Sequence, residues 1–142
     1  MPRFLFQLLF FVCLGMTCEI FFTAFTNLYN NEPFCGEPLW SLTGKTYVWM
    51  AFIYGLIPVF AELLFKRLAH LATLPRLLVY VGLIYAVEFG SGFLLEQLTG
   101  KCPWEYTSGW QVMGYIRLDY FPAWLFFAYW VEKLYLFVDS KF

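Results

Sequence analysis

Residues Leu74–Leu98, "LPRLLVYVGLIYAVEFGSGFLLEQL", are a long and predominantly apolar stretch. A helix needs about 20 predominantly apolar residues to cross a hydrocarbon core of about 30 Å, and this stretch is long enough. It lacks the strict alternation of a barrel strand, so a helix is expected. Similar apolar runs cover Phe4–Asn27, Thr46–Leu68 and Leu118–Val138. The sequence therefore predicts an all-α membrane protein, a bundle of four transmembrane helices in one domain over residues 1–142.

The composition agrees with a chain that faces lipid. Of its 142 residues 61% are hydrophobic and 13% are charged, whereas typical globular chains carry about 25% charged residues. A soluble domain of this size could not bury so much apolar surface. We expect an integral, multi-pass protein surrounded by membrane lipids, without specifying which membrane. The formal net charge of -1 gives no reason to expect a nucleic-acid partner, and a homo-oligomer or transporter partner subunits stay open.

The basic residues indicate the orientation of the predicted helices. If the N-terminus is cytoplasmic, six of them lie inside: Arg3, Lys66, Arg67, Arg76, Lys133 and Lys141. The three outside are Lys45, Lys101 and Arg117. This asymmetry follows the positive-inside rule and predicts that both termini are cytoplasmic. The first run also resembles a signal peptide, but apolar character resumes after Glu19, so a retained helix is expected.

Four glutamates suggest an internal repeat. Glu19 and Glu88 have the same spacing, to within one residue, as Glu62 and Glu132. Two helical hairpins related by an axis along the membrane normal would produce this pattern. Parallel hairpin repeats are therefore an alternative description of the four-helix bundle.

Glutamates within the apolar runs are the strongest sign of a functional site. Each ionised residue near the bilayer centre costs about 2.5–3.5 kcal/mol, so Glu19, Glu62 and Glu88 are expected to face inward and to have partners. Glu62 is expected to form a structural ion pair with Lys66, one helical turn away. Glu19 and Glu88 are candidate ligand-binding carboxylates, with small residues near Glu88 (Gly90–Gly92) that would let another helix or a ligand approach. The alternative is that these acids only join helices by hydrogen bonds.

A polar and aromatic segment, "GKCPWEYTSGWQVMGYIRLDYFPAW" (Gly100–Trp124), follows the run that contains Glu88. We expect it to cap the outer face above Glu19 and Glu88. Arg117 could bind a phosphate or a carboxylate bidentately. The expected ligand-binding residues in this segment are Trp104, Glu105, Tyr106, Arg117, Asp119 and Trp124. The alternative is an aromatic belt at the membrane interface with a structural salt bridge.

Familiar catalytic and metal-binding motifs are missing from the sequence. His70 is the single histidine, and neither HExxH nor GxSxG occurs, so we expect no metal and no cofactor. Cys35 and Cys102 both fall in predicted outer loops. They could form a disulfide in an oxidising compartment, or they could be two unrelated thiols.

Five short pieces of the sequence carry a family resemblance. They are "CEIFFTAF" (Cys18–Phe25), "FIYGLIPVFAE" (Phe52–Glu62), "EFGSGFLLEQ" (Glu88–Gln97), "CPWEY" (Cys102–Tyr106) and "GYIRLDY" (Gly114–Tyr120). On these, the chain resembles the transmembrane protein 229 family and the related bacterial CmpB-like proteins, labelled type IV ABC-transporter permeases. The resemblance implies a small multi-pass membrane protein without an assigned activity, and a transporter role would require partner chains. The family usually has aspartate where this chain has the longer Glu105.

Three functions are consistent with these features. The first is the binding or translocation of a small amphiphile or ion at an outward-facing carboxylate and arginine site. The second is an integral-membrane enzyme that modifies lipids, with Glu88 or Glu19 in acid/base catalysis. The third is a scaffold or accessory subunit without a small-molecule site. We favour the first, because ionisable residues inside a membrane usually serve a function.

Overall fold

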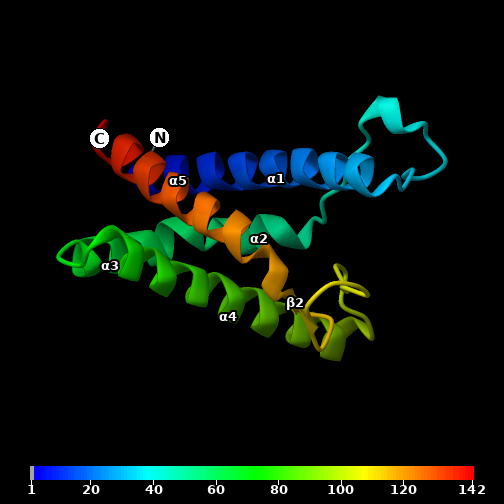
Figure 1. The fold of residues 1–142 in the computed structure, drawn as a ribbon. Helices are drawn as coiled ribbons and strands as arrows, with labels where there is room; N and C mark the ends of the chain where they lie inside the picture. Colours follow the sequence, from blue (N-terminus) through cyan, green and yellow to red (C-terminus); the bar gives the residue numbers. More distant parts are fainter. Residues whose placement is uncertain (1) are drawn as a thin grey trace. The chain divides into compact units, whose positions relative to one another are not determined.

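The computed structural model describes residues 2–142, which are mostly helical (Figure 1). The helices are α1 (Arg3–Asn30), α2 (Trp49–Gly55), α3 (Ile57–Leu68), α4 (Thr73–Thr99) and α5 (Phe121–Asp139). Two short 3-10 helices, η1 (Leu39–Ser41) and η2 (Leu118–Tyr120), and the antiparallel strands β1 (Gln111–Val112) and β2 (Ile116–Arg117) complete the described elements. The chain divides into two compact units, Met1–Pro58 and Val59–Phe142, called the first and second unit below.

Three helical stretches are long and apolar enough to cross a membrane: Arg3–Asn30, Trp49–Leu68 and Thr73–Thr99. They correspond to the first three predicted runs. The fourth run, Leu118–Val138, begins as η2 and continues as α5, which is not among the three. Charged residues such as Glu132 and Lys133 lower its mean hydropathy. That α5 crosses a membrane stays a prediction, as do the orientation of the termini and the hairpin repeats.

In the first unit, α2 packs closely against α1 because α1 has a glycine at the contact. A Cβ atom at Gly15 would lie 2.3 Å from the ring of Tyr54 on α2, so no larger residue fits there without displacing that ring. The segment between α1 and α2 is also attached to α1, since the backbone N–H of Lys45 donates a hydrogen bond to Thr23 Oγ1 at 2.7 Å. Together these contacts hold α2 and the residues before it along α1.

In the second unit, α4 and α5 pack around a small apolar core. Leu77, Tyr80 and Val81 of α4 recur at helical spacing and are buried with Ala128 of α5. Phe65 of α3 adds ring contacts, with its centroid 4.9 Å from that of Tyr80. This core covers the N-terminal half of α4, and a different segment packs against the C-terminal half.

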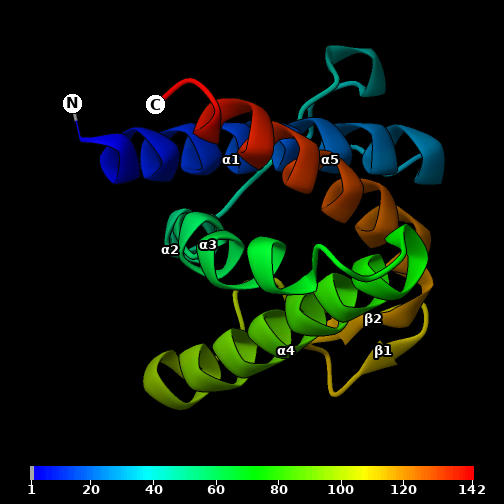
Figure 2. The same ribbon diagram turned by 90° about the vertical axis from the view of Figure 1, so that its left-hand side faces the viewer.

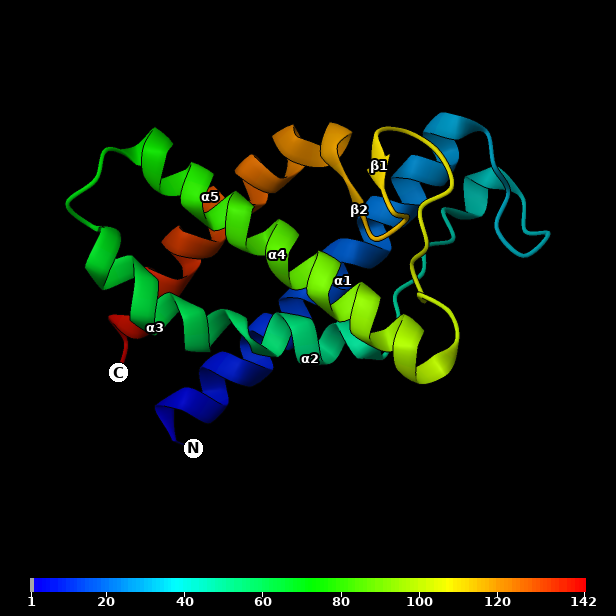
Figure 3. The same cartoon turned by 90° about the horizontal axis from the view of Figure 1, so that it is seen from below.

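That segment is Gly100–Tyr120, called the return segment below, which runs back alongside α4 (Figures 2 and 3). Its Tyr115 hydroxyl donates to Glu96, and its Tyr106 hydroxyl donates to Glu88 Oε1 at 2.8 Å. Further back, the Tyr85 hydroxyl donates to the carbonyl oxygen of Arg117 at 3.2 Å. At 1.5 Å per residue, Tyr85 lies about 21 Å before the end of α4. The segment expected to cap the outer face above Glu88 therefore lies beside the second half of α4 and contacts Glu88 directly. That it forms an outer cap stays a prediction.

At the opposite end of α4, a buried ion pair attaches it to α5. Arg76 Nε and Nη2 donate to the two carboxylate oxygens of Glu132, each at 2.8 Å, and Nη1 donates to the Leu71 carbonyl at 2.9 Å. The side chains of Arg76 and Glu132 are only 13% and 5% exposed. Among the ion pairs of residues 2–142, the expected pair of Glu62 and Lys66 is not found. Both side chains are exposed on α3, where an ion pair would contribute little to stability.

We expect Arg76→Ala to destabilise the protein strongly, because it leaves the Glu132 carboxylate buried without its charged partner. Removing one member of a buried pair costs about 3 kcal/mol or more. Equilibrium unfolding with sodium dodecyl sulfate, followed by circular dichroism, measures the loss. The matched control is Arg67→Ala on the exposed face of α3, for which a change within about 0.5 kcal/mol is expected. Equal losses in the two variants would show that the pair contributes nothing.

Candidate functional site

The expected ligand-binding residues are distributed over both units. Glu19 belongs to the first unit, and all the others belong to the second: Glu88, Trp104, Glu105, Tyr106, Arg117, Asp119 and Trp124. Each group is therefore described with the neighbours of its own unit. A joint site of Glu19 and Glu88 stays a prediction.

Glu19 of the first unit is half-buried on α1 and is bound by two hydroxyl groups. Its Oε2 atom accepts hydrogen bonds from Thr46 Oγ1 at 2.7 Å and from the Tyr54 hydroxyl at 3.3 Å. The sequence indicated Glu19 but missed Thr46 and Tyr54, since an uncharged threonine and one tyrosine in a chain with 24% aromatic residues do not stand out. Hydroxyl donors of this kind stabilise a carboxylate without adding a second charge to the helix.

Glu88 of the second unit is half-buried on α4, and the return segment supplies its donor. The Tyr106 hydroxyl lies 2.8 Å from Glu88 Oε1. The ring of Tyr106 packs edge-to-face on Tyr120, with centroids 5.9 Å apart. The polar segment and the deep carboxylate, which the sequence indicated separately, are thus directly in contact.

Arg117 is held by neighbours within the return segment. Its Nε atom donates to Asp119 Oδ1 at 3.1 Å, Nη2 donates to Oδ2, and Nη1 lies 3.0 Å from the Tyr120 hydroxyl. The guanidinium carbon also lies 4.2 Å from the centroid of the Tyr120 ring, a cation–π contact. These contacts connect Glu88, Tyr106, Tyr120, Arg117 and Asp119 in one series, called the Glu88 network below.

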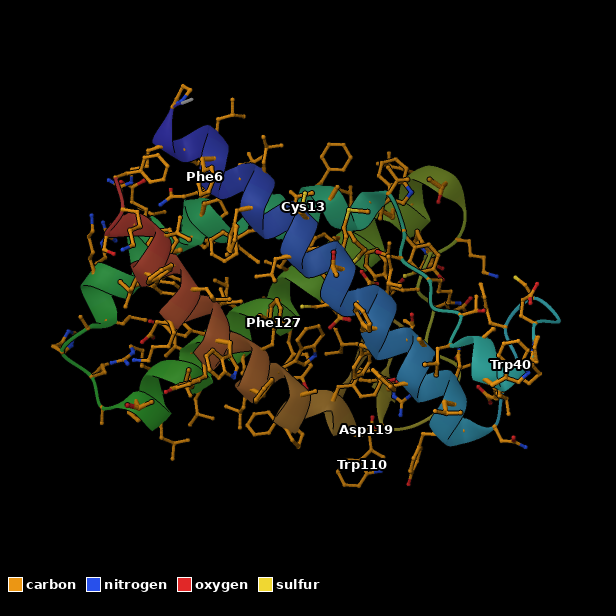
Figure 4. All side chains as sticks on the ribbon, turned by 90° about the horizontal axis from the view of Figure 1, so that it is seen from above. Phe6, Cys13, Trp40, Trp110, Asp119 and Phe127 are labelled. Atoms are coloured by element: carbon orange, nitrogen blue, oxygen red, sulfur yellow. The ribbon has the colours of Figure 1, made fainter. Side chains whose placement is uncertain are left out.

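Within this network, Arg117 and Asp119 form an ion pair, whereas Glu88 is bound by a neutral hydroxyl. The guanidinium of Arg117 lowers the pKa of Asp119 below its usual range, and the backbone N–H of Trp110 adds a further bond to Asp119 Oδ1 at 3.1 Å. Trp110 and Asp119 lie close together in Figure 4. Asp119 therefore stays ionised at neutral pH, and an anionic ligand would have to compete with it for Arg117.

The remaining expected residues lie outside the Glu88 network. Trp104 is buried, and its Nε1 atom donates to the carbonyl oxygen of Tyr115 at 3.2 Å, so it holds the return segment together. Trp124 packs on the core between α4 and α5. Glu105 is exposed and faces Lys101 at 4.0 Å. Their expected roles at a ligand stay predictions, and their contacts here are structural.

A glycine explains how the return segment approaches α4 so closely. A Cβ atom at Gly92 would lie 3.2 Å from the Tyr115 ring and 3.3 Å from Cys102 Sγ, so a larger residue would push the segment away. The neighbour that Gly92 admits is the return segment, and the expected approach of another helix or a ligand stays a prediction. Gly90 differs, because a Cβ atom there would meet no atom within 4 Å.

The cysteines are free thiols, so the structure contains no disulfide between Cys35 and Cys102. Cys35 is exposed, whereas Cys102 of the return segment is buried and lies close to Gly92 of α4. Burial raises the pKa of the Cys102 thiol. Between residues 2 and 142 there is no group of three or more His, Cys, Asp or Glu side chains that could hold a metal ion.

No protein-family model matches the chain, and no solved structure matches it.

We expect Tyr115→Phe to change how stability depends on pH. The hydrogen bond to Glu96 raises the pKa of Tyr115 to about 12, whereas an ordinary phenol has a pKa of about 10. The folded protein holds this proton more tightly, so the stabilisation is complete below about pH 10 and is lost as the pH rises towards 12. The alkaline fall in melting temperature should be shallower in the variant. The control is Tyr29→Phe, at a residue that is 90% exposed, and its melting temperature should depend on pH as that of the wild type does. If Tyr115→Phe also shows the wild-type pH dependence, the hydrogen bond between Tyr115 and Glu96 is absent.

We also expect the two loop cysteines to differ in reactivity. In folded protein in mild detergent, a soluble maleimide should modify Cys35 well before Cys102, because Cys102 is only 2% exposed and its thiolate is disfavoured. Peptide mass spectrometry at several reaction times measures both sites. Protein denatured in sodium dodecyl sulfate, where both should react alike, is the control. Equal rates in the folded protein would contradict the packing of the return segment on α4.

Proposed function

We propose that this chain is an integral membrane protein that crosses the bilayer several times and binds or passes a small ion or amphiphile at the Glu88 network. Three helical stretches with the length and hydropathy of membrane spans support the placement in a membrane. The basic residues favour cytoplasmic termini. The site would lie where α4 meets the return segment.

The observation that carries the proposal is the bond between Glu88 and Tyr106. Glu88 lies inside a helix apolar enough to span a membrane, and the residue that binds it comes from an irregular, polar segment. Carboxylates at that depth are expensive, and membrane proteins keep them mainly at ion or substrate pathways. A helix that only needed anchoring could use an apolar residue at this position.

The charges near the site favour a positively charged ligand group. Along the return segment and the side of α4 that it covers, the carboxylates are Glu88, Glu96, Glu105 and Asp119, and the basic residues are Lys101 and Arg117. Arg117 is already paired with Asp119. We therefore propose a cation or an ammonium-bearing amphiphile as the ligand, in place of the anionic group that Arg117 alone would suggest.

We also propose kinship with the transmembrane protein 229 family and its CmpB-like relatives, and hence a role beside transporter partner subunits. The two most specific motifs, Cys102–Tyr106 and Gly114–Tyr120, both lie in the return segment. They meet where the Tyr106 N–H donates to the Gly114 carbonyl at 2.8 Å. The residues that this chain would share with the family therefore include Tyr106, Arg117, Asp119 and Tyr120 of the Glu88 network.

The proposed function is tested by comparing two amphiphiles of equal chain length, decylamine and decanoate. Binding to the purified protein in non-ionic detergent is measured by microscale thermophoresis. We expect decylamine to bind more tightly, and Glu88→Gln to weaken its binding about tenfold, which corresponds to about 1.4 kcal/mol. Arg117→Ala should also lose binding, with expression intact, because it releases Tyr120 and Asp119.

Lys101→Ala is the matched control, since this side chain is 77% exposed at the end of α4; it should bind nearly as the wild type does. Equal binding of decanoate, or wild-type binding by Glu88→Gln, would refute the proposal. Chemical conversion of lipids by the purified protein, detected by mass spectrometry, would favour the enzyme hypothesis instead.

A further inference from the structure

We infer that the return segment is re-entrant: it passes back beside α4 to about the middle of the membrane, and its polar side faces water that enters from one side. This inference rests on the proposed membrane placement of α4. It adds a route by which a hydrated solute reaches the level of Glu88.

The depth of the segment follows from three contacts along α4. Starting from the end of the helix at Thr99, the segment meets Glu96, then Glu88, and then Tyr85. A helix of 27 residues is about 40 Å long, so Tyr85 lies close to its midpoint. The hydrocarbon core is about 30 Å thick. If α4 crosses it, the chain near Arg117 lies deep within the membrane rather than at its surface.

The position where α5 begins agrees with this depth. The chain leaves the return segment at Tyr120 and enters α5 at Phe121, close to the level of Tyr85. Further along, Glu132 of α5 binds Arg76 near the start of α4. Figure 3 shows that α5 crosses the first half of α4, whereas the return segment lies beside the second half.

Irregular backbone at such a depth is tolerated only where it is buried in protein or faces water. One side of the return segment is buried, with Cys102, Trp104 and Tyr115 packed towards α4. The exposed residues of the segment include four apolar ones, Trp110, Val112, Met113 and Leu118. They also include five polar ones, Glu105, Thr107, Ser108, Gln111 and Asp119. These groups cannot face acyl chains without losing their hydrogen bonds with water.

Exposed apolar side chains of the same segment show where the polar side ends. Trp110 and Met113 are 75% and 69% exposed. They are suited to contact lipid at the border of the water-filled region, because tryptophan prefers the boundary between water and hydrocarbon. The water path is thus limited to one side of the segment and does not cross the whole bilayer along α5.

The test is the accessibility of single cysteines in proteoliposomes to a membrane-impermeant, positively charged methanethiosulfonate reagent. Native cysteines are replaced by alanine, and Ser108→Cys, Gly90→Cys and Lys101→Cys are introduced one at a time. Ser108 reports on the exposed side of the return segment, and Lys101 reports on the end of α4. Gly90 lies near Glu88 but about 200° around the helix, where a Cβ atom would meet no neighbour.

We expect Ser108→Cys to react within about tenfold of the rate of Lys101→Cys and at least about 100-fold faster than Gly90→Cys, because the reactive thiolate requires water. Slow labelling of both Ser108→Cys and Gly90→Cys beside fast labelling of Lys101→Cys would overturn the water path and leave the membrane placement intact. Fast labelling of all three would overturn the membrane placement, and the proposed function with it. If the cysteine-free protein does not fold, a background that keeps the buried Cys102 replaces it.

Discussion

The second unit depends on the need of one carboxylate for a hydrogen-bond donor. Glu88 lies within an apolar helix, where an ionised side chain without partners would be several kcal/mol too costly. Its donor, Tyr106, is in the segment that follows the helix, so that segment has to turn back along α4 to reach it. Once it does so, Tyr115 reaches Glu96, and the backbone at Arg117 meets Tyr85. The path of the chain after α4 is thus the path that satisfies the polar groups on one side of the helix.

The carboxylates near the two ends of α4 are stabilised by different kinds of hydrogen-bond donor. Near its start, Arg76 and Glu132 satisfy each other in a bidentate pair that fixes α5. Towards its end, the glutamates are bound by neutral tyrosine hydroxyls, which are less strongly bound to water than an ammonium group and cost less to bury. An ion pair suits a permanent attachment, because breaking it exposes two charges. A hydroxyl–carboxylate bond costs less to break, which suits the end of the helix where we place the ligand.

The apolar runs predicted the three helical stretches that are long and apolar enough to cross a membrane, because hydropathy is a local property that does not depend on packing. Glu88, Tyr106 and Arg117 could be indicated as well, since polar residues are conspicuous in so apolar a chain. The pair of Arg76 and Glu132 could not, because it joins residues 56 positions apart that meet only through tertiary packing. Local spacing favoured Glu62 and Lys66 instead. The polar and aromatic composition of Gly100–Trp124 distinguished this segment from the apolar runs, but it contains no information about the direction of the segment relative to α4.

The self-contained pairing of Arg117 and Asp119 has a further consequence for the return segment. An isolated arginine near mid-membrane would oppose any inward fold of the chain, since its hydration would be lost. With Asp119 two residues away and the Tyr120 ring against the guanidinium, the charge is compensated within the segment itself. The segment can therefore move towards or away from α4 without separating its own ion pair. Such a movement would break the hydroxyl bonds to Glu88 and Glu96, the bond from Tyr85 to the Arg117 carbonyl, and the packing of Tyr115 at Gly92. These contacts together determine how firmly the segment is held.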